Sequence, residues 1–420
     1  MLAIRLDSAN MTVNQMKSGP LAGVRVLELG SFIAGPFAGQ LLGDYGADVI
    51  KVEAPGHGDP MRTWGITKDG ESLWWPGIAR NKRSVALDLR DARGRDLLGR
   101  LIAGTDVVLE NFRPGRLDEW GLGYEAMSDV NPGLIMVHVS GFGQTGPRAA
   151  EAGFGSIGEA VGGIRFTTGS PDRAAARCGI SLGDSLAALF AVIGTMGALN
   201  ERNRSGRGQE VDVAIYEAVA ALMESTMADF EIGEVLRQRT GSVLPGVAPS
   251  NVYPSGDGGT IIIAANADAV YRRLCTAMGR PDLATDSRFA THGDRGTNMD
   301  VLDAEIAEWT STLPTAELLA TLADNGVPAG EIFTAANMLK DPHYAAREMV
   351  VRLDNRAGVS VPMSGVVPKF SRTPGGADTC GPPLGNETAA ALRAVGVSED
   401  ELVALEAAGI IQTAGGSVES

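Results

Sequence analysis

The sequence predicts an α/β protein in which a largely parallel sheet carries helices on its faces and a smaller α+β domain follows. Two observations lead to this prediction. Short apolar segments typical of buried strands alternate with helical segments over the first half of the chain, an order that favours parallel strands joined through helices. A segment rich in glycine, proline and serine, residues 239–259, then interrupts the alternation and marks a change of domain.

The predicted large domain begins with a β-α-β unit. The apolar segment 24–29 is expected to be a buried strand, residues 37–45 a helix and residues 47–53 a second strand. Further elements are expected in the order of strands at 84–89, 106–111 and 134–142, a long helix from near Asp184 to about Arg202, and a second long helix through Met223 and Ile232. This order again favours a parallel sheet covered by helices.

The smaller domain is expected to begin with TIIIAA (260–265). Helices are expected near 267–278, 298–311 and 315–325, an irregular Pro/Gly-rich stretch at 340–385, and two helical segments at 387–396 and 399–409. The predicted divisions of the chain are an N-terminal arm at 1–20, the first part of the large domain at 21–238, the small domain with its linker at 239–340, and a final segment at 341–420.

Composition and charge exclude several classes of partner. The formal charge of −15 argues against nucleic acid or an anionic membrane, because both require a broad positive surface. The apolar segment 185–199 is shorter than the roughly 20 residues that span a bilayer, and is expected to be a buried core helix. The chain start lacks the pattern of a secretory signal, and Cys178, Cys275 and Cys380 form no disulfide or metal-ligand pattern. A cytoplasmic protein is expected.

The turn after the first strand, GSFIAGPFAG, is the first candidate ligand site. Gly30, Gly35 and Gly39 would let the backbone approach a ligand closely, and a helix N-terminus can face a phosphate. The segment lacks the GxGxxG dinucleotide fingerprint, and Pro36 suits the first turn of any helix. A nucleotide-type ligand and a tight packing turn both fit this segment.

Polar and basic residues that directly follow predicted strands form the second candidate site. Arg90, Asn111, Phe112 and Arg113 come after strands whose carboxyl ends meet at one edge of a parallel sheet, where ligands of open α/β folds bind. Such an edge could hold a polyanion with an adenine. The alternative is that each arginine is an ordinary solvated surface charge.

Asp184, in SLGDSLAALF, is the candidate nucleophile. Aspartate is a favoured helix N-cap, so a capping role explains it without chemistry. A helix N-terminus also keeps a carboxylate ionised, and an ionised carboxylate can attack a thioester. The histidines offer no rival chemistry, since no HExxH or paired-ligand spacing occurs among His57, His138, His292 and His343.

The segments taken together resemble the family III CoA-transferases from about Leu21 to about Gly385. The resemblance lies in their order, spacing and residues: LAGVRVLELGSFIAGPFAGQLLGDYGADVIKVEAPGHGDPMR, NKRSVALDLR, ENFRPGRLDEWGLGYE, SGFGQTGP, GISLGDSLAALFAVIGTMGAL and SGRGQEVDVAIYEA. It implies a Rossmann-like large domain built from both chain ends, a small domain, and a homodimer of two interlocked subunits. The resemblance therefore favours the catalytic interpretation of Asp184 over capping.

The resemblance also implies the site. Its catalytic aspartate corresponds to Asp184 within Gly183-Asp184-Ser185. The implied CoA-binding residues are Ile33, Ala34, Leu87, Asp88, Leu89, Arg90, Asn111, Phe112, Arg113, Val139, Ser140, Gly141 and Phe142. No metal and no cofactor are expected, because the CoA thioester is itself a substrate. Two positions depart from the family: Ala54-Pro55 stands where some members place an arginine near the adenine, and Glu119 stands where a basic residue is common, with Arg116 as a substitute.

The implied reaction passes CoA from an acyl-CoA to a carboxylic acid through a covalent intermediate on Asp184. Family habit suggests succinyl-CoA as donor and a small dicarboxylate as acceptor. Backbone N–H groups of Gly183 or of residues 245–260 are candidate oxyanion donors. The long glycine loop of the oxalate branch is replaced by the shorter LPGVAPSNVYP.

Two other functions remain open from the sequence. An α-methylacyl-CoA racemase needs two acid/base groups around the α-carbon, but the stretch that matches its histidine is Ala152-Gly153-Phe154-Gly155. A non-catalytic CoA-binding protein would not need Asp184. For the acyl group, Trp64, Trp74 and Trp75 are candidates for lining a pocket, and core packing explains each of them equally well.

Overall fold

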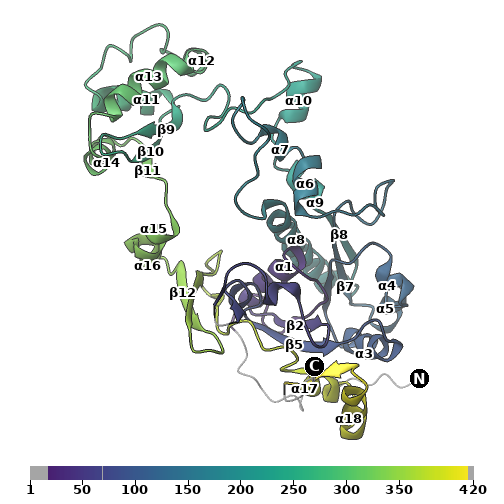
Figure 1. The fold of residues 1–420 in the computed structure, drawn as a ribbon. Coiled ribbons are helices and arrows are strands. Elements are labelled where there is room, and N and C mark those ends of the chain that lie inside the picture. The colour runs from purple at the N-terminus through teal and green to yellow at the C-terminus, as the bar shows by residue number, and fades with distance from the viewer. Residues whose placement is uncertain (1–17, 69, 415–420) are drawn as a thin grey trace. The chain divides into compact units, whose positions relative to one another are not determined.

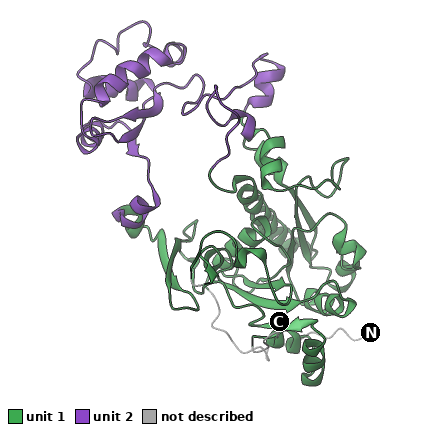
Figure 2. Ribbon diagram, in the orientation of Figure 1, with its two compact units in different colours: residues 1–164, 179–224, 343–420 green, residues 165–178, 225–342 purple. Residues whose placement is uncertain are grey.

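The computed structural model describes residues 18–68 and 70–414, and these fall into two compact units. The first unit comprises the described parts of 1–164 and 343–420 together with 179–224, and the second comprises 165–178 and 225–342 (Figure 2). Most of the predicted N-terminal arm lies outside the described residues. Segments from both ends of the described chain belong to the first unit.

The first unit is built on a sheet that, within the described residues, has seven strands in the order β14-β5-β2-β1-β6-β7-β8. All neighbours pair in parallel except β14, which runs antiparallel to β5. The strands are β1 (Arg25–Glu28), β2 (Asp48–Glu53), β5 (Lys82–Leu87), β6 (Val107–Glu110), β7 (Ile135–Ser140), β8 (Glu210–Ala214) and β14 (Ile411–Gln412). The expected strands at 24–29, 47–53, 84–89, 106–111 and 134–142 are confirmed within two residues at each end.

Helices cover both faces of this sheet (Figure 1). Successive strand residues point to opposite faces, so Val107 and Leu109 join one core while Val108 joins the other. The first core contains α1 (Ala34–Asp44), α8 (Leu182–Ser205) and α9 (Ile215–Ala220). The second contains α3 (Ala92–Ala103), α17 (Thr388–Ala394) and α18 (Glu399–Ala407).

The remaining elements of the first unit are short. They are η1 (Pro60–Arg62), β3 (Thr67–Lys68), β4 (Glu71–Ser72), α2 (Trp75–Ile78), α4 (Arg116–Glu119), α5 (Tyr124–Val130), α6 (Gly155–Val161), β12 (Val350–Asp354) and β13 (Ser360–Ser364). β12 and β13 form an antiparallel hairpin. The expectation that residues 340–385 are irregular is therefore wrong for this hairpin, whose turn is stabilised by the Asn355 side chain accepting from the Val359 N–H.

The α8 helix has the predicted place but not quite the predicted ends. Among the described residues it is the one helix long and apolar enough to cross a membrane by length and composition, which is weak evidence because core helices meet the same test. Half of its apolar stretch is buried in the fold, where it packs against α1, α9 and β7. The expected long helix through Met223 and Ile232 is wrong: α9 ends at Ala220, Glu224 has a φ of +51°, and α10 (Thr226–Glu231) is a separate helix.

The second unit contains an antiparallel sheet in the order β11-β10-β9, packed with helices around its own apolar core. Its strands are β9 (Ser250–Pro254), β10 (Thr260–Ala264) and β11 (Ala329–Glu331). Its helices are α10, α11 (Asp268–Ala277), α12 (His292–Thr297), α13 (Met299–Thr310), α14 (Thr315–Asp324) and α15 (Ala335–Lys340). Two further helices, α7 (Ile164–Thr167) and α16 (Pro342–Ala346), each span a boundary between the units. The helices expected near 267–278, 298–311 and 315–325 are confirmed.

Candidate active site

Asp184 lies in the first turn of α8, the third residue of the helix. The N-cap is Ser181, whose side chain makes no capping hydrogen bond within the described part of the chain. The interpretation of Asp184 as the N-cap is therefore wrong. The carboxylate instead lies where the partial positive charge of the helix N-terminus stabilises an anion.

The Asp184 carboxylate lies directly against the backbone of Gly155, the first residue of α6. A β-carbon added at Gly155 would lie 2.2 Å from Oδ2 and 2.6 Å from Cγ of Asp184. The neighbouring Gly183 N–H donates to Glu159 Oε1 at 3.3 Å, and Glu159 is buried. This N–H, an expected candidate oxyanion donor, is therefore engaged by Glu159 in this arrangement. Glycine at 155 leaves the space that the carboxylate occupies.

The turn between β1 and α1 contains the predicted residues Ile33 and Ala34, and both side chains are buried. A β-carbon at Gly30 would lie 3.1 Å from the Gly35 Cα, so tight packing explains these glycines. The packing interpretation of this segment is thus supported, and a ligand at this turn stays a prediction.

The predicted residues in the turn after β6 differ in their surroundings: two contact other parts of the chain, and one is exposed. Asn111 accepts from the Ser31 N–H and donates to the Ser31 carbonyl, both at 2.8 Å, so its amide holds the β1 turn. Phe112 is partly buried and stacks edge-on against Trp120 at 5.5 Å. Arg113 is exposed and forms no ion pair with the described residues. Arg116, the expected substitute for a missing base, is paired with Glu119 at 2.7 Å.

The turn after β5 holds the other predicted basic residue. Leu87 is buried at the strand end and Leu89 is partly buried. Arg90 is exposed and its Nε pairs with Asp88 Oδ1 at 2.9 Å. This hydrogen bond is the main reason that the pKa of Asp88 is lowered. The Arg90 charge is therefore already partly compensated.

The predicted segment Val139–Phe142 lies at the end of β7 and packs closely against the chain that precedes α6. Val139, Ser140 and Phe142 are buried, and a β-carbon at Gly141 would lie 2.6 Å from the Gly153 Cα. This close approach links the end of β7 to the segment that precedes Gly155.

The predicted binding residues thus lie at the carboxyl ends of β1, β5, β6 and β7. From β5 to β7 the sheet spans four strand spacings, or roughly 19 Å. That length suits an extended ligand rather than a compact one.

Sequence reasoning missed two buried charge clusters in the strands. In the first, Lys51 Nζ lies 2.9 Å from Glu28 Oε1 and 2.8 Å from Asp59 Oδ2, and Lys82 Nζ lies 2.7 Å from Glu28 Oε2. Burial would lower the pKa of Lys51, but attraction to Glu28 and Asp59 outweighs burial and raises it. The signal was in the sequence: charged residues inside the apolar runs VRVLEL and VIKVE.

The second cluster joins His138 to two glutamates across β6, β7 and β8. Nδ1 of His138 lies 2.5 Å from Glu110 Oε1, and Nε2 lies 3.2 Å from Glu210 Oε1. Burial would lower the pKa of His138, but the hydrogen bond and charge of Glu110 raise it above its ordinary value. This histidine, which showed no motif in the sequence, borders Val139 and the other predicted residues of β7.

Exposed aromatic rings gather near Gly155. The Phe32 ring lies 6.4 Å from that of Phe154 and 5.4 Å from that of Trp64, which stacks on Trp74 at 6.0 Å. Phe154 therefore offers a ring where a racemase would need a base. Of the tryptophans proposed for an acyl pocket, Trp75 is a packing residue: it is buried and its Nε1 donates to the Pro382 carbonyl.

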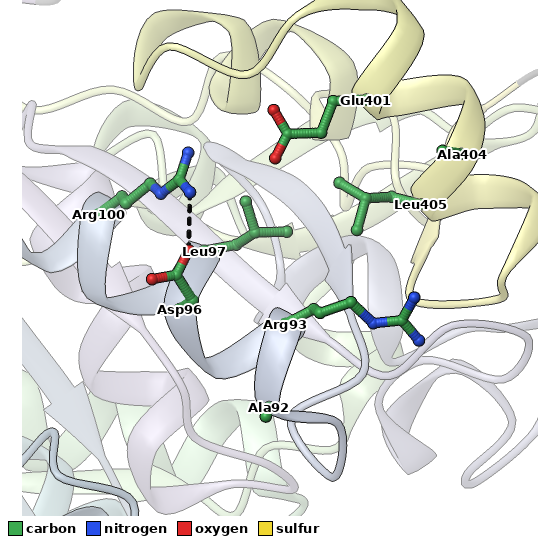
Figure 3. Close-up of a pocket in the computed structure, with 8 residues that line it drawn as sticks. All are labelled: Ala92, Arg93, Asp96, Leu97, Arg100, Glu401, Ala404 and Leu405. Carbon is green, nitrogen blue, oxygen red and sulfur yellow. Dashed lines mark ion pairs between the residues drawn. The ribbon is translucent and has the colours of Figure 1, made fainter.

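A separate surface pocket lies between α3 and α18 (Figure 3). Its lining residues are Ala92, Arg93, Asp96, Leu97, Arg100, Glu401, Ala404 and Leu405, none of which belongs to the predicted site. Arg100 is paired with Asp96 at 2.8 Å, as the dashed line shows, and Arg93 with Asp91 at 2.9 Å. Within the described residues, no group of three His, Cys, Asp or Glu side chains is arranged to hold a metal ion.

The fold, together with the sequence segments that resemble family III CoA-transferases, defines the class of protein as a CoA-transferase. The chain belongs to CoA-transferase family III, whose model matches residues 21–388. It is 54% identical over 400 residues to a succinyl-CoA–D-citramalate CoA-transferase of Chloroflexus aurantiacus, covering 95% of this chain and 100% of that protein. It is 37% identical over 396 residues to the alpha subunit of a succinyl-CoA–L-malate CoA-transferase of Chloroflexus aurantiacus, covering 93% of this chain and 92% of that subunit.

Comparison with solved structures supports the same family. A CaiB/BaiF family protein from Brucella suis superimposes with a TM-score of 0.79 and 38% identity, covering 90% of this chain and 100% of that one. The prediction of a family III CoA-transferase is thus confirmed, and the enzyme transfers CoA between acyl-CoA and carboxylic acids. A non-catalytic CoA-binding role is excluded by the same findings.

Proposed function

We propose that this enzyme transfers CoA from succinyl-CoA to a small dicarboxylate through a covalent intermediate on Asp184. The observation that carries the proposal is the contact of the Asp184 carboxylate with Gly155, in the first turn of α8. A carboxylate in this place is stabilised as an anion and is thereby available as a nucleophile.

The proposed reaction runs through two kinds of covalent bond to Asp184. The carboxylate attacks the thioester carbonyl of the donor, the C–S bond breaks, and a mixed anhydride and CoA thiolate result. The thiolate then attacks the aspartyl carbonyl, and the donor acid leaves as a carboxylate. The acceptor carboxylate attacks the aspartyl-CoA thioester, and the steps reverse to release the new acyl-CoA. Every bond and charge is supplied by Asp184 and the substrates, so the proposal needs no metal or cofactor.

The substrates are proposed from the relatives. The protein at 54% identity is named for succinyl-CoA and D-citramalate, and those at 37% and 38% for succinyl-CoA and L-malate. Both named acceptors are small hydroxy-dicarboxylates. Succinyl-CoA as donor and an acceptor of this class extend these names to the present chain.

CoA is proposed to lie along the carboxyl ends of the strands. The predicted residues Ile33–Ala34 and Val139–Phe142 lie at this edge, and Arg113 supplies an exposed guanidinium without an ion-pair partner among the described residues. A planar guanidinium suits phosphate, which it can bind through two parallel hydrogen bonds.

A mutation at Asp184 tests the nucleophile. Asp184→Asn keeps the size of the side chain but removes the anion, and we expect turnover to fall by several orders of magnitude while CoA binding persists. The matched measurement is intact-mass spectrometry after mixing with succinyl-CoA. The intact wild-type chain should gain the mass of CoA less water, digestion should locate this mass on the peptide that contains Asp184, and the variant should gain none. Turnover above a few per cent of wild type in the variant would rule out this nucleophile.

A second copy of the chain is proposed to cover an exposed apolar face of the first unit. Leu189, Ile193 and Met196 lie three and four residues apart on α8 and are exposed, and Ile157 and Val161 on the adjoining α6 are exposed as well. Several exposed apolar side chains on neighbouring helices are typical of an interface. The homodimer proposed here, interlocked as the family resemblance implies, would bury this face.

Light scattering during dilution tests the dimer. The wild-type mass should stay that of two chains down to nanomolar concentration, because interlocked subunits separate only on unfolding. Ile193→Glu should lower the yield of dimer, whereas Val403→Glu, on the exposed side of α18, should not. A folded wild-type monomer on dilution would contradict the interlocked arrangement.

A further inference from the structure

Phe32 has a backbone conformation that a bulky residue rarely adopts. Its φ is +64°, in the left-handed region, at the middle of the turn between β1 and α1. Such a conformation persists only where the surrounding structure imposes it, and it occurs often at functional sites. The residues that impose it here, and the place to which it sends the ring, can both be identified.

Two side chains hold the backbone on either side of the strained residue. Asp59 Oδ1 accepts from the Phe32 N–H at 3.3 Å. Asn111 makes two hydrogen bonds to the backbone of Ser31: its Oδ1 accepts from the Ser31 N–H, and its Nδ2 donates to the Ser31 carbonyl. The peptide that joins residues 31 and 32 is therefore fixed from two directions.

Buried charges hold Asp59 itself. Its Oδ2 lies 2.8 Å from Lys51 Nζ, and Lys51 also donates to the Gly30 carbonyl at 2.7 Å and to Glu28 at 2.9 Å. The side chains of Lys51, Glu28 and Asp59 are each at most 1% exposed. Charges buried this deeply stay in place only while all their partners remain, so the cluster acts as a rigid support.

The imposed conformation sends the Phe32 ring outward to Phe154. The two rings meet edge to face with centroids 6.4 Å apart, and both keep open surface, 38% for Phe32 and 68% for Phe154. Phe154 directly precedes Gly155, against which the Asp184 carboxylate lies. The exposed ring pair is thus joined directly through the chain to the glycine against which the proposed nucleophile lies.

We propose that Phe32 and Phe154 form an apolar wall that contacts the hydrocarbon part of the acid bound at Asp184, with Phe32 determining acid specificity and Asp59 positioning Phe32. This proposal rests on the proposed role of Asp184. A wall of this kind distinguishes acids that differ by a methyl group. One methyl in an apolar contact changes kcat/KM by roughly 10-fold or more.

The experiment compares two acceptors that differ by one methyl, malate and its 2-methyl derivative citramalate, with succinyl-CoA as donor. The measured quantity is the ratio of kcat/KM for citramalate to that for malate in one enzyme sample. Loss of folded protein lowers both values equally, so the ratio reports only on contacts to the acid. For Phe32→Ala we expect the ratio to fall by about 10-fold.

Further variants separate positioning from packing. Asp59→Ala should lower the ratio in the same direction, and Asp59→Asn should lower it less, because an amide oxygen can still accept from the Phe32 N–H. Phe32→Gly removes the ring, and glycine adopts the positive φ without strain. The ratio of kcat/KM can therefore be measured in this variant even if Phe32→Ala folds poorly. The control is Arg80→Gln, which breaks a buried pair with Asp44 at the opposite end of α1 and should leave the ratio unchanged.

Each outcome bears on a separate statement. An unchanged ratio in both Phe32 variants would overturn the wall. A shifted ratio in the Phe32 variants with an unchanged ratio in Asp59→Ala would overturn the positioning role alone. A shift in Arg80→Gln as large as in Asp59→Ala would also overturn that role, since any buried pair would then act alike. Wild-type enzyme that uses neither acid would overturn the dicarboxylate assignment and this proposal together, whereas failure at Asp184 appears separately in the mass measurement.

Discussion

The turns after β1 and β5 are stabilised in opposite ways, although the family resemblance assigns both to CoA. Behind the β1 turn, Lys51 donates to the Gly30 carbonyl from within a cluster of buried charges. At the β5 turn, Arg90 pairs only with Asp88, two residues away, and the Arg90 side chain is 85% exposed. The β1 turn is thus held by buried charges from other strands. The β5 turn carries an exposed ion pair, and its backbone is held by Arg95 and by the Ile410 carbonyl, which accepts from the Asp88 N–H.

This difference indicates what each turn can contribute to catalysis. A backbone fixed by buried charges keeps its place when a ligand binds, which is what groups near a reacting atom require. An exposed pair is weakened by salt and exchanges readily with water, so it can adjust to a flexible, charged part of a ligand. The rigid turn therefore suits the thioester end of CoA, and the adjustable one suits its phosphates.

The largest expected effect breaks the rigid turn. Lys51→Met keeps the length of the side chain but leaves the carboxylates of Glu28 and Asp59 buried with one cation fewer. We expect the free energy of unfolding to fall by about 3–5 kcal/mol, the usual cost of removing one partner from a buried ion pair. Urea denaturation followed by circular dichroism measures it. Arg90→Ala is the comparison variant from the exposed turn and should unfold like the wild type.

Equal losses of stability in these two variants would contradict the distinction between the turns. A large loss for Lys51→Met alone would support it, and a double variant should then show the sum of the two single effects, because the sites share no partner.

The sequence predicted the large sheet well because its signals are local. Each parallel strand is a short apolar run with a glycine or charged residue at its end, and both cores follow from the alternation within those runs. The break between α9 and α10 was missed because no glycine or proline separates the two helices, and the positive φ of Glu224 ends the first one instead. The β12–β13 hairpin was missed because prolines and glycines around it masked its alternating residues.

The site was predictable by residue type but not by contact. Asp184 could be singled out in its glycine turn, whereas its contact with Gly155 joins segments about 30 residues apart and has no local signal. The same holds for Asn111, for which CoA binding stays a prediction: the hydrogen bonds of its amide to Ser31 join segments 80 residues apart. Charged residues within apolar strands were the one signal of the buried clusters, and their pairing depended on strand order.

A smaller effect is expected at the ends of β5 and β6, where two exposed arginines differ in their partners. Arg113 forms no ion pair with the described residues, whereas Arg90 is held by Asp88. Arg113→Ala should raise the KM for acyl-CoA by about 10-fold, the lower range for a charge-assisted hydrogen bond, with little change in kcat. Arg90→Ala should raise it less. Steady-state kinetics over a range of succinyl-CoA concentrations measures both, and a larger effect at Arg90 would reverse the assignment of these charges.

The smallest effect concerns His138, whose surroundings are intermediate between the buried charges at the β1 turn and the exposed ion pair at the β5 turn. Its ring is buried with Glu110, while its second partner, Glu210, is about half exposed. Burial lowers the pKa of His138 but the Glu110 hydrogen bond and charge raise it more, so the folded protein binds the proton more tightly than the unfolded chain, whose reference pKa is 6.5. The resulting stabilisation is complete below pH 6.5 and is lost as the pH rises through the folded pKa.

The free energy of unfolding of the wild type should therefore decline over this pH interval relative to that of His138→Gln, whose side chain does not titrate there. Urea unfolding of both proteins across a pH series measures the difference, and parallel curves would show that folding does not raise the pKa of His138.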